Sequence, residues 1–135
     1  MATRVPVTLV PPRGSDAKKQ TGTLWLAAEF LRLEYKPRFS FRAKVSEYQI
    51  PFEGIKSATY DTGFLNDKII VVVRDKASLD SLITADLDKA RFILEVDKDE
   101  RDHARSLVRQ IQLDRMGDIF EEMLEITDLN PDPDL

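Results

Sequence analysis

Apolar and polar residues alternate along much of the first hundred positions, the two-residue period of a β-strand with one buried face. Strands are therefore predicted over 38–46, 48–52, 56–60, 68–74 and 91–96, after a hairpin made by 23–26 and 30–35. The apolar face changes parity between Val45 and Tyr48. A one-residue slip would turn every side chain to the other face, so a bulge or bend is predicted near Glu47.

Two segments depart from simple alternation. Residues 69–73 are five consecutive branched aliphatic residues, which predicts a central strand covered on both faces. Between residues 75 and 90, apolar residues recur at near-helical spacing, at Leu79, Leu82, Ile83 and Leu87. This connection is predicted to form one or two helical turns, or else an extended loop that carries the same side chains.

One amphipathic helix is predicted directly after 91–96, from Asp99 to Met116. Asp97 or Asp99 caps its start and Gly117 its end. Its buried stripe has i, i+3, i+4, i+7 spacing and consists of Ala104, Leu107, Val108 and Ile111. The predicted core joins this helix to the strands and comprises Leu24, Leu26, Leu33, Phe41, Ile50, Ile70, Val72, Phe92, Leu94, Leu107, Val108 and Ile111.

The first twenty residues are predicted to be an N-terminal extension. Val5, Val7 and Leu9 alternate, but Pro6 and the Pro11-Pro12 pair favour an edge strand that leads into a polar linker. The domain itself is predicted to span residues 21–117. Residues 118–135 are expected to form an acidic C-terminal helix and tail.

The chain has 135 residues, a length that suits one domain, and a net charge of −4. This charge is distributed unevenly along the sequence. Seven acidic residues and no basic ones occur from Asp118 to Leu135. The remaining 17 acidic and 20 basic residues give 1–117 a net charge of about +3. This asymmetry predicts a tail that docks on the body or forms a separate contact surface.

Within that tail, residues 119–126 are predicted to form a short amphipathic helix. Its apolar side chains are Phe120, Met123 and Leu124. They are expected to pack against the body of the same subunit or of a neighbouring one, so a homo-oligomer is left open. Alternatively, the segment docks into a groove of a partner protein.

Residues able to carry catalysis are scarce. The chain has no cysteine and one histidine, His103, which is predicted to be a surface or partly buried helix residue. It also lacks a glycine-rich phosphate loop and a nucleophile elbow. We therefore expect a binding domain that is not an enzyme and uses neither metal nor cofactor. No apolar run approaches the ~20 residues of a membrane span, and the N-terminus has no uninterrupted signal-peptide core, so a cytoplasmic location is expected.

The clearest candidate for ligand chemistry is a run of four bases within nine positions that hold no acid: Lys36, Arg38, Arg42 and Lys44. Such residues can contact the phosphates of an anionic membrane through charge-assisted hydrogen bonds. Strand alternation gives a simpler interpretation, in which Arg42 and Lys44 only occupy a solvated face. Nucleic acid is disfavoured as a partner, because the whole chain is negatively charged.

Three parts of the sequence carry a family resemblance: Gly22–Leu26 with Phe30–Leu33, Tyr48–Ile55, and Arg91–Val96 with the helix Arg105–Leu113. Together they resemble the pleckstrin-homology-like fold, including its GRAM-type and bacterial members, over residues 21–116. The resemblance implies a bent β-sandwich or partly open barrel that a C-terminal helix plugs. It also implies that bases near the first strands grip phosphoinositides. The chain departs from many members in carrying its tryptophan, Trp25, in a strand rather than in the closing helix.

These observations predict a mainly β binding module closed by one C-terminal helix. The leading hypothesis is an adaptor that binds another protein through a sheet edge or the acidic helix. The alternative is binding of anionic phospholipid, including phosphoinositides, through Lys36, Arg38, Arg42 and Lys44.

Overall fold

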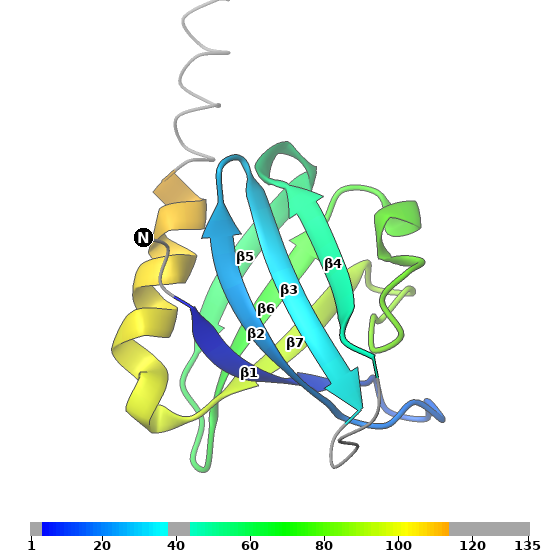
Figure 1. The fold of residues 1–135 in the computed structure, drawn as a ribbon, viewed down its shortest axis with the longest axis horizontal. Coiled ribbons are helices and arrows are strands. Elements are labelled where there is room, and N and C mark those ends of the chain that lie inside the picture. The colour runs from blue at the N-terminus through cyan, green and yellow to red at the C-terminus, as the bar shows by residue number, and fades with distance from the viewer. Residues whose placement is uncertain (1–3, 38–43, 114–135) are drawn as a thin grey trace, which may run out of the picture.

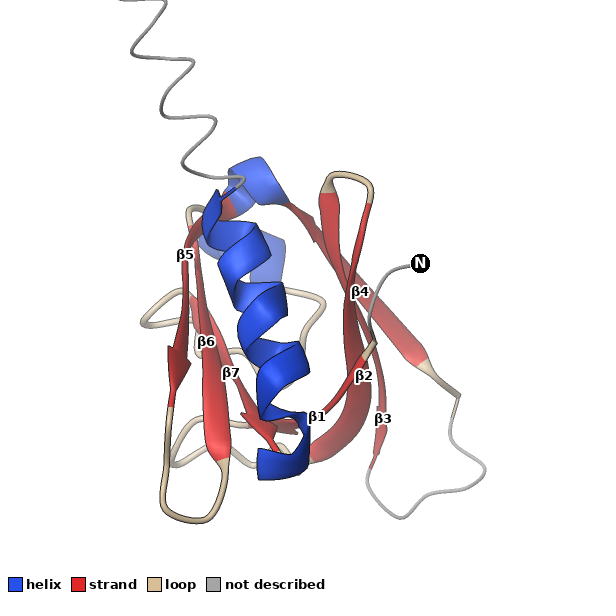
Figure 2. Ribbon diagram, turned by 90° about the vertical axis from the view of Figure 1, so that its left-hand side faces the viewer, coloured by secondary structure: helices blue, strands red, loops and turns tan. Residues whose placement is uncertain are grey.

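The computed structural model describes residues 4–37 and 44–113. Its strands are β1 Val5–Val10, β2 Gln20–Ala27, β3 Phe30–Pro37, β4 Ser46–Pro51, β5 Ile55–Asp61, β6 Asp67–Val73 and β7 Arg91–Val96. They form one antiparallel sheet in the order β4-β3-β2-β1-β7-β6-β5, in which β4 and β5 are the two free edges. The sheet bends so that β2–β4 lie opposite β5–β7 (Figures 1 and 2). The prediction of a mainly β domain closed by one terminal helix is thus confirmed.

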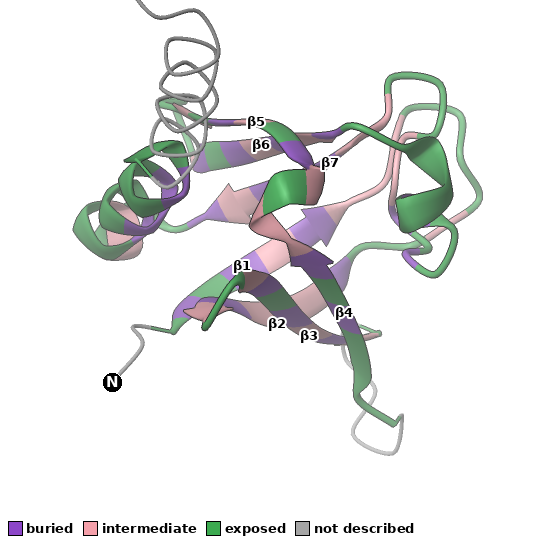
Figure 3. Ribbon diagram, turned by 90° about the horizontal axis from the view of Figure 1, so that it is seen from above, coloured by how far each residue is buried: buried purple, intermediate pink, exposed green. Residues whose placement is uncertain are grey.

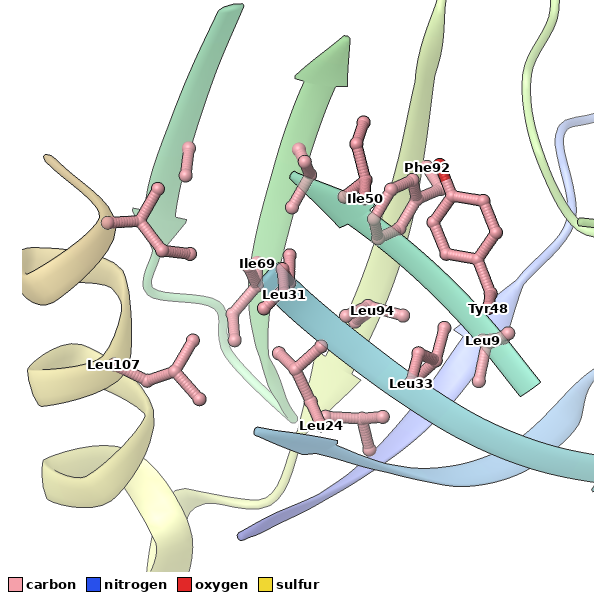
Figure 4. Close-up of a cluster of buried hydrophobic side chains, with 14 of the residues drawn as sticks. Leu9, Leu24, Leu31, Leu33, Tyr48, Ile50, Ile69, Phe92, Leu94 and Leu107 are labelled. Atoms are coloured by element: carbon pink, nitrogen blue, oxygen red, sulfur yellow. The ribbon is translucent and has the colours of Figure 1, made fainter. Parts of the chain in front are cut away.

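The core lies between these two layers (Figure 4). Leu24, Leu33 and Tyr48 stand opposite one another on β2, β3 and β4, and all three are buried. The Tyr48 and Phe92 rings meet edge to face across the layers, with centroids 5.7 Å apart. Most of the predicted core is confirmed as buried, namely Leu24, Leu33, Ile50, Phe92, Leu94, Leu107, Val108 and Ile111. Leu26 is half-buried, and Phe41 lies outside the described residues.

The prediction of which β6 residues face the core is wrong. Ile70 and Val72 are only half-buried, whereas Ile69, Val71 and Val73 are buried in the core. β6 has a neighbour on each side but the opposite layer on only one face. Five aliphatic residues in a row give no polar position that would reveal which face that is.

The C-terminal helix covers the opening between the layers (Figure 2). A 3-10 turn, Lys98–Glu100, leads into an α-helix over 101–113, the last described residue. The predicted stripe Ala104, Leu107, Val108 and Ile111 is buried and faces the layers (Figure 3). Gln112 also donates its side-chain amide to the Ala58 carbonyl of β5 at 2.8 Å. The helix therefore covers part of the β5 edge as well as the core.

β1 is central in the sheet, so the prediction of an edge strand in an N-terminal extension is wrong. It pairs with β2 through Val5–Leu9 and with β7 through Thr8–Val10. At Pro6, β1 therefore has a single neighbour, which is why a proline is tolerated in this strand. The sheet begins at Val5 rather than at Thr21.

The connection from β6 to β7 closes the side of the molecule opposite the helix (Figure 1). It contains one 3-10 turn, Lys76–Leu79, followed by irregular turns. Leu79 and Leu82 are buried, while Ile83 and Leu87 are exposed. Tyr35 of β3 donates its hydroxyl to the Ser81 carbonyl at 3.1 Å, which ties the connection to the other layer.

Candidate functional site

The structure describes only part of the predicted basic site. Lys36 is half-buried near the end of β3, and Lys44 is exposed two residues before β4. Arg38 and Arg42 lie outside the described residues, as do the predicted tail residues Phe120, Met123 and Leu124. Lys36 and Lys44 thus flank the same inter-strand connection.

A different feature stands out at the turn between β5 and β6. Phe64 and Leu65, here called the hairpin tip, are 92% and 78% exposed. They are the two most exposed large hydrophobic residues in the described part of the chain. Water surrounds both side chains, although burial of either would contribute about 1.5–3 kcal/mol. An apolar pair displayed in this way is typical of a contact surface.

The hairpin tip is held by a hydrogen-bonded cluster around Asp67, the first residue of β6. Arg101 of the helix binds the fully buried Asp67 carboxylate in a bidentate manner, with Nε 2.6 Å from Oδ2 and Nη2 3.1 Å from Oδ1. Tyr60 of β5 donates its hydroxyl to Oδ2 at 2.5 Å, and the Gly63 amide donates to Oδ1 at 3.2 Å. Both ends of the turn are thereby tied to the start of the helix.

The electrostatics of this Asp67 cluster favour a charged carboxylate. Hydrogen bonds from Arg101 and then from Tyr60 hold the pKa of Asp67 well below its ordinary value, and outweigh the opposing effect of burial. Burial, followed by the hydrogen bond to Asp67, raises the pKa of Tyr60 to about 12. The Arg105 guanidinium lies over the Tyr60 ring, with Cζ 5.3 Å from the ring centroid. The cluster is therefore a fixed anchor across the neutral pH range.

A second feature lies on the outer face of β2–β4. Trp25, Arg32 and Gln49 stand in one cross-strand row, while Glu34 and Glu47 face each other in the next. The Arg4 guanidinium covers the Trp25 ring, with Cζ 4.2 Å from its centroid, and leaves the tryptophan only 8% exposed. A hollow of about 430 Å³, here called the outer-face hollow, is lined by Arg4, Trp25, Arg32, Glu34, Glu47, Tyr48 and Gln49.

Neither the hairpin tip nor the outer-face hollow was predicted from the sequence. The hairpin tip could have been predicted, because turn-forming residues flank it on both sides: Gly63 before it, and Asn66 and Asp67 after it. Apolar residues within a turn indicate an exposed apolar tip. The outer-face hollow had no such signal. Its residues come from three strands and from Arg4, which precedes β1, and only the register of the sheet brings them together.

Within residues 4–37 and 44–113, no three side chains of His, Cys, Asp or Glu gather in a way that could hold a metal ion. His103 is exposed, as predicted, with Nδ1 3.2 Å from a Glu100 carboxylate oxygen. Among residues 4–37 and 44–113, no helix is both long and apolar enough to cross a membrane.

Comparison with protein-family models and with curated proteins gives no match for this chain.

Proposed function

We propose that this protein is a non-catalytic recognition module that binds another protein through its hairpin tip. The observation that carries the proposal is the exposure of Phe64 and Leu65 on a turn that the Asp67 cluster holds in place. Contact residues that are already ordered lose little conformational entropy on binding. The order of the strands and the position of the helix also support the pleckstrin-homology-like resemblance, although one fold serves many functions.

The charges beside the hairpin tip favour a protein over an anionic membrane. Asp61, Lys68 and Glu95 form a cross-strand row next to the turn, and Asp97 and Asp99 are exposed where the helix begins. Carboxylates in these places would be repelled by the negative surface potential of an anionic leaflet. A partner pocket with an apolar centre and a basic rim fits both the tip and its surroundings.

A second candidate function is binding of anionic phospholipid near the β3–β4 connection. One observation favours it, namely that Lys18 and Lys19 come directly before β2, whose first residue pairs with Pro37 at the end of β3. These lysines therefore lie at the same strand ends as Lys36. However, Lys19 already forms an ion pair with Glu95 at 3.5 Å, which reduces its availability.

The test compares three forms of the full chain: wild type, the double variant Phe64→Ser/Leu65→Ser, and the matched control Ile83→Ser/Leu87→Ser. The control changes two other exposed apolar residues, 62% and 48% exposed, on the β6–β7 connection. Partners are identified by co-purification from the native host, and their affinities are then measured by calorimetry with purified proteins. We expect the tip variant to lose at least about 30-fold in affinity, the effect of removing a buried aromatic anchor. The control should bind like wild type.

Equal binding by the tip variant and the control would refute the tip as the contact surface. Sedimentation with phosphatidylcholine vesicles, with and without phosphatidylserine or phosphoinositide, separates the second candidate. If Lys36→Ala/Lys44→Ala abolishes vesicle binding and the tip variant does not, the lipid function is supported instead. Such binding should weaken as salt is added, because exposed charges are screened.

A further inference from the structure

We propose that the free edge of β4 accepts an extended segment of a partner protein, and that this segment places a lysine or arginine opposite Glu47. This surface is separate from the hairpin tip. The proposal shares with the proposed function only the premise that the ligand is a protein, and it stands if the tip proves inert.

The backbone of β4 is open for pairing along one side. Phe52 donates its amide to the Glu29 carbonyl at 2.9 Å, one step beyond the last pair of the β3–β4 ladder. This bond shows which residues of β4 direct their backbone groups toward β3. Since hydrogen-bonded pairs alternate in an antiparallel ladder, Tyr48 and Ile50 direct their backbone groups toward β3. Glu47 and Gln49 direct theirs away from the sheet, and both residues are exposed. Figure 3 shows the alternation of buried and exposed bands along β4. An added strand would therefore find N–H and C=O groups ready to pair.

The other edge of the sheet is less open. The Gln112 side chain of the helix already occupies the outward carbonyl of Ala58 on β5. A register shift between Ile55 and Ser57 further interrupts that strand. Because bulged and covered edges resist strand addition, β4 is the favoured acceptor.

The side chains beside the β4 edge identify the chemistry of the occupant. Glu34 and Glu47 are directly opposite each other in a non-hydrogen-bonded pair, where side chains approach most closely. Within the described residues, neither carboxylate has an ion pair or a side-chain hydrogen bond. Like charges in this arrangement destabilise a sheet. A cation in the next strand position would convert that repulsion into attraction.

The outer-face hollow gives such a cation room. Glu47 and Glu34 line it together with two bases: Arg4 is held over the Trp25 ring, and Arg32 stands in the neighbouring cross-strand row, opposite Gln49. A long basic side chain opposite Glu47 can therefore lie over the two carboxylates rather than beside the bases. Trp25 contributes no stacking surface, because Arg4 already covers its ring. The recognition element is therefore the pair of carboxylates, not the aromatic ring.

A second copy of this chain is a poorer occupant of the edge. Antiparallel pairing of two β4 strands about Tyr48 would place Glu47 opposite Gln49 of the other copy, and pairing about Glu47 would bring four carboxylates together. Neither arrangement supplies a cation. Charge complementarity thus favours a partner segment with a basic residue over self-association.

The experiment titrates the isotope-labelled full chain with two capped seven-residue peptides and follows backbone amide shifts by NMR. The probe is Thr-Thr-Val-Lys-Val-Thr-Thr, and the matched control has Glu in place of Lys. We expect weak binding of the Lys peptide, with shifts centred on the amides of residues 47 and 49. Its affinity should exceed that of the Glu peptide by about fivefold, as expected for exposed cross-strand charge pairs.

Two variants make this result specific. Glu47→Lys should reverse the preference, so that the Glu peptide becomes the tighter ligand. Gln49→Pro should abolish binding of both peptides, because it removes an outward N–H without breaking a bond to β3. Equal affinities for the two peptides, or a Glu47→Lys variant with unchanged preference, would overturn the proposal. So would concentration-dependent dimerisation of the wild type that Gln49→Pro prevents, since the edge would then belong to a second copy.

Discussion

Replacing Leu107 with alanine tests whether the C-terminal helix belongs to the cooperative core. Leu107 is 5% exposed and points from the helix into the space between the layers (Figure 4). Leu113 on the same helix is 54% exposed. The two substitutions make the same chemical change, so a difference between them reports burial alone.

The expected loss follows from this burial. Transfer of a leucine side chain from water to the core contributes about 1.5–3 kcal/mol, and unfilled space raises the cost of Leu→Ala to about 2–5 kcal/mol. Ala104, Val108 and Ile111 flank the site from the same helix and are themselves buried, so they cannot readily move into the gap. We expect Leu107→Ala to lower the unfolding free energy by about 3 kcal/mol and Leu113→Ala by less than about 0.5 kcal/mol.

Urea unfolding followed by two signals measures the effect. Trp25 is the only tryptophan and lies on the outer face of β2, so its fluorescence reports the sheet. Far-ultraviolet circular dichroism adds a signal from the helix. The two transitions should coincide in all three proteins, and only Leu107→Ala should shift their midpoint, with an unchanged slope. A Leu107→Ala midpoint equal to that of Leu113→Ala, or helix loss that precedes the fluorescence transition, would refute the reasoning.

Three further predictions concern stability. Gly22→Ala should lower the melting temperature more than Gly14→Ala, because the added Cβ at position 22 would meet the Glu34 carbonyl oxygen of the adjacent strand. At position 14 nothing lies within 4 Å, so an alanine there meets only the strain of a φ of +83°; equal melting curves would contradict this. Asp67→Asn should reduce the urea midpoint at neutral pH and flatten its acid dependence. The carboxylate has a lowered pKa when folded, so its contribution to stability is full at pH values well above its ordinary pKa of 3.8 and is progressively lost as the pH falls below that value; a variant with wild-type acid dependence would exclude this role. Phe64→Ser/Leu65→Ser should leave the unfolding free energy within about 0.5 kcal/mol of wild type, as for other exposed side chains; a larger loss in chemical denaturation would mean that the tip packs on the domain.

The sequence alone predicted those strands and the helix whose patterns lie within one continuous segment. The hairpin of β2 and β3, the strand that ends at Val96 and the apolar stripe of the helix were all predicted from neighbouring residues. Each depends on the geometry of one segment, in which side-chain direction follows directly from the backbone period. The exposure of His103 followed from the same helical spacing.

Only the tertiary structure decided which segments meet. β1 is central because it pairs with β7, whose residues are distant in sequence, and Pro6 therefore misled a local interpretation. The buried face of β6 depends on where the opposite layer lies, and the lowered pKa of Asp67 is due chiefly to Arg101 from the helix. The carboxylates of Glu34 and Glu47 likewise face each other only through the β3–β4 register. Pairing between distant segments is set by the packing of the whole core, which no single stretch of sequence encodes.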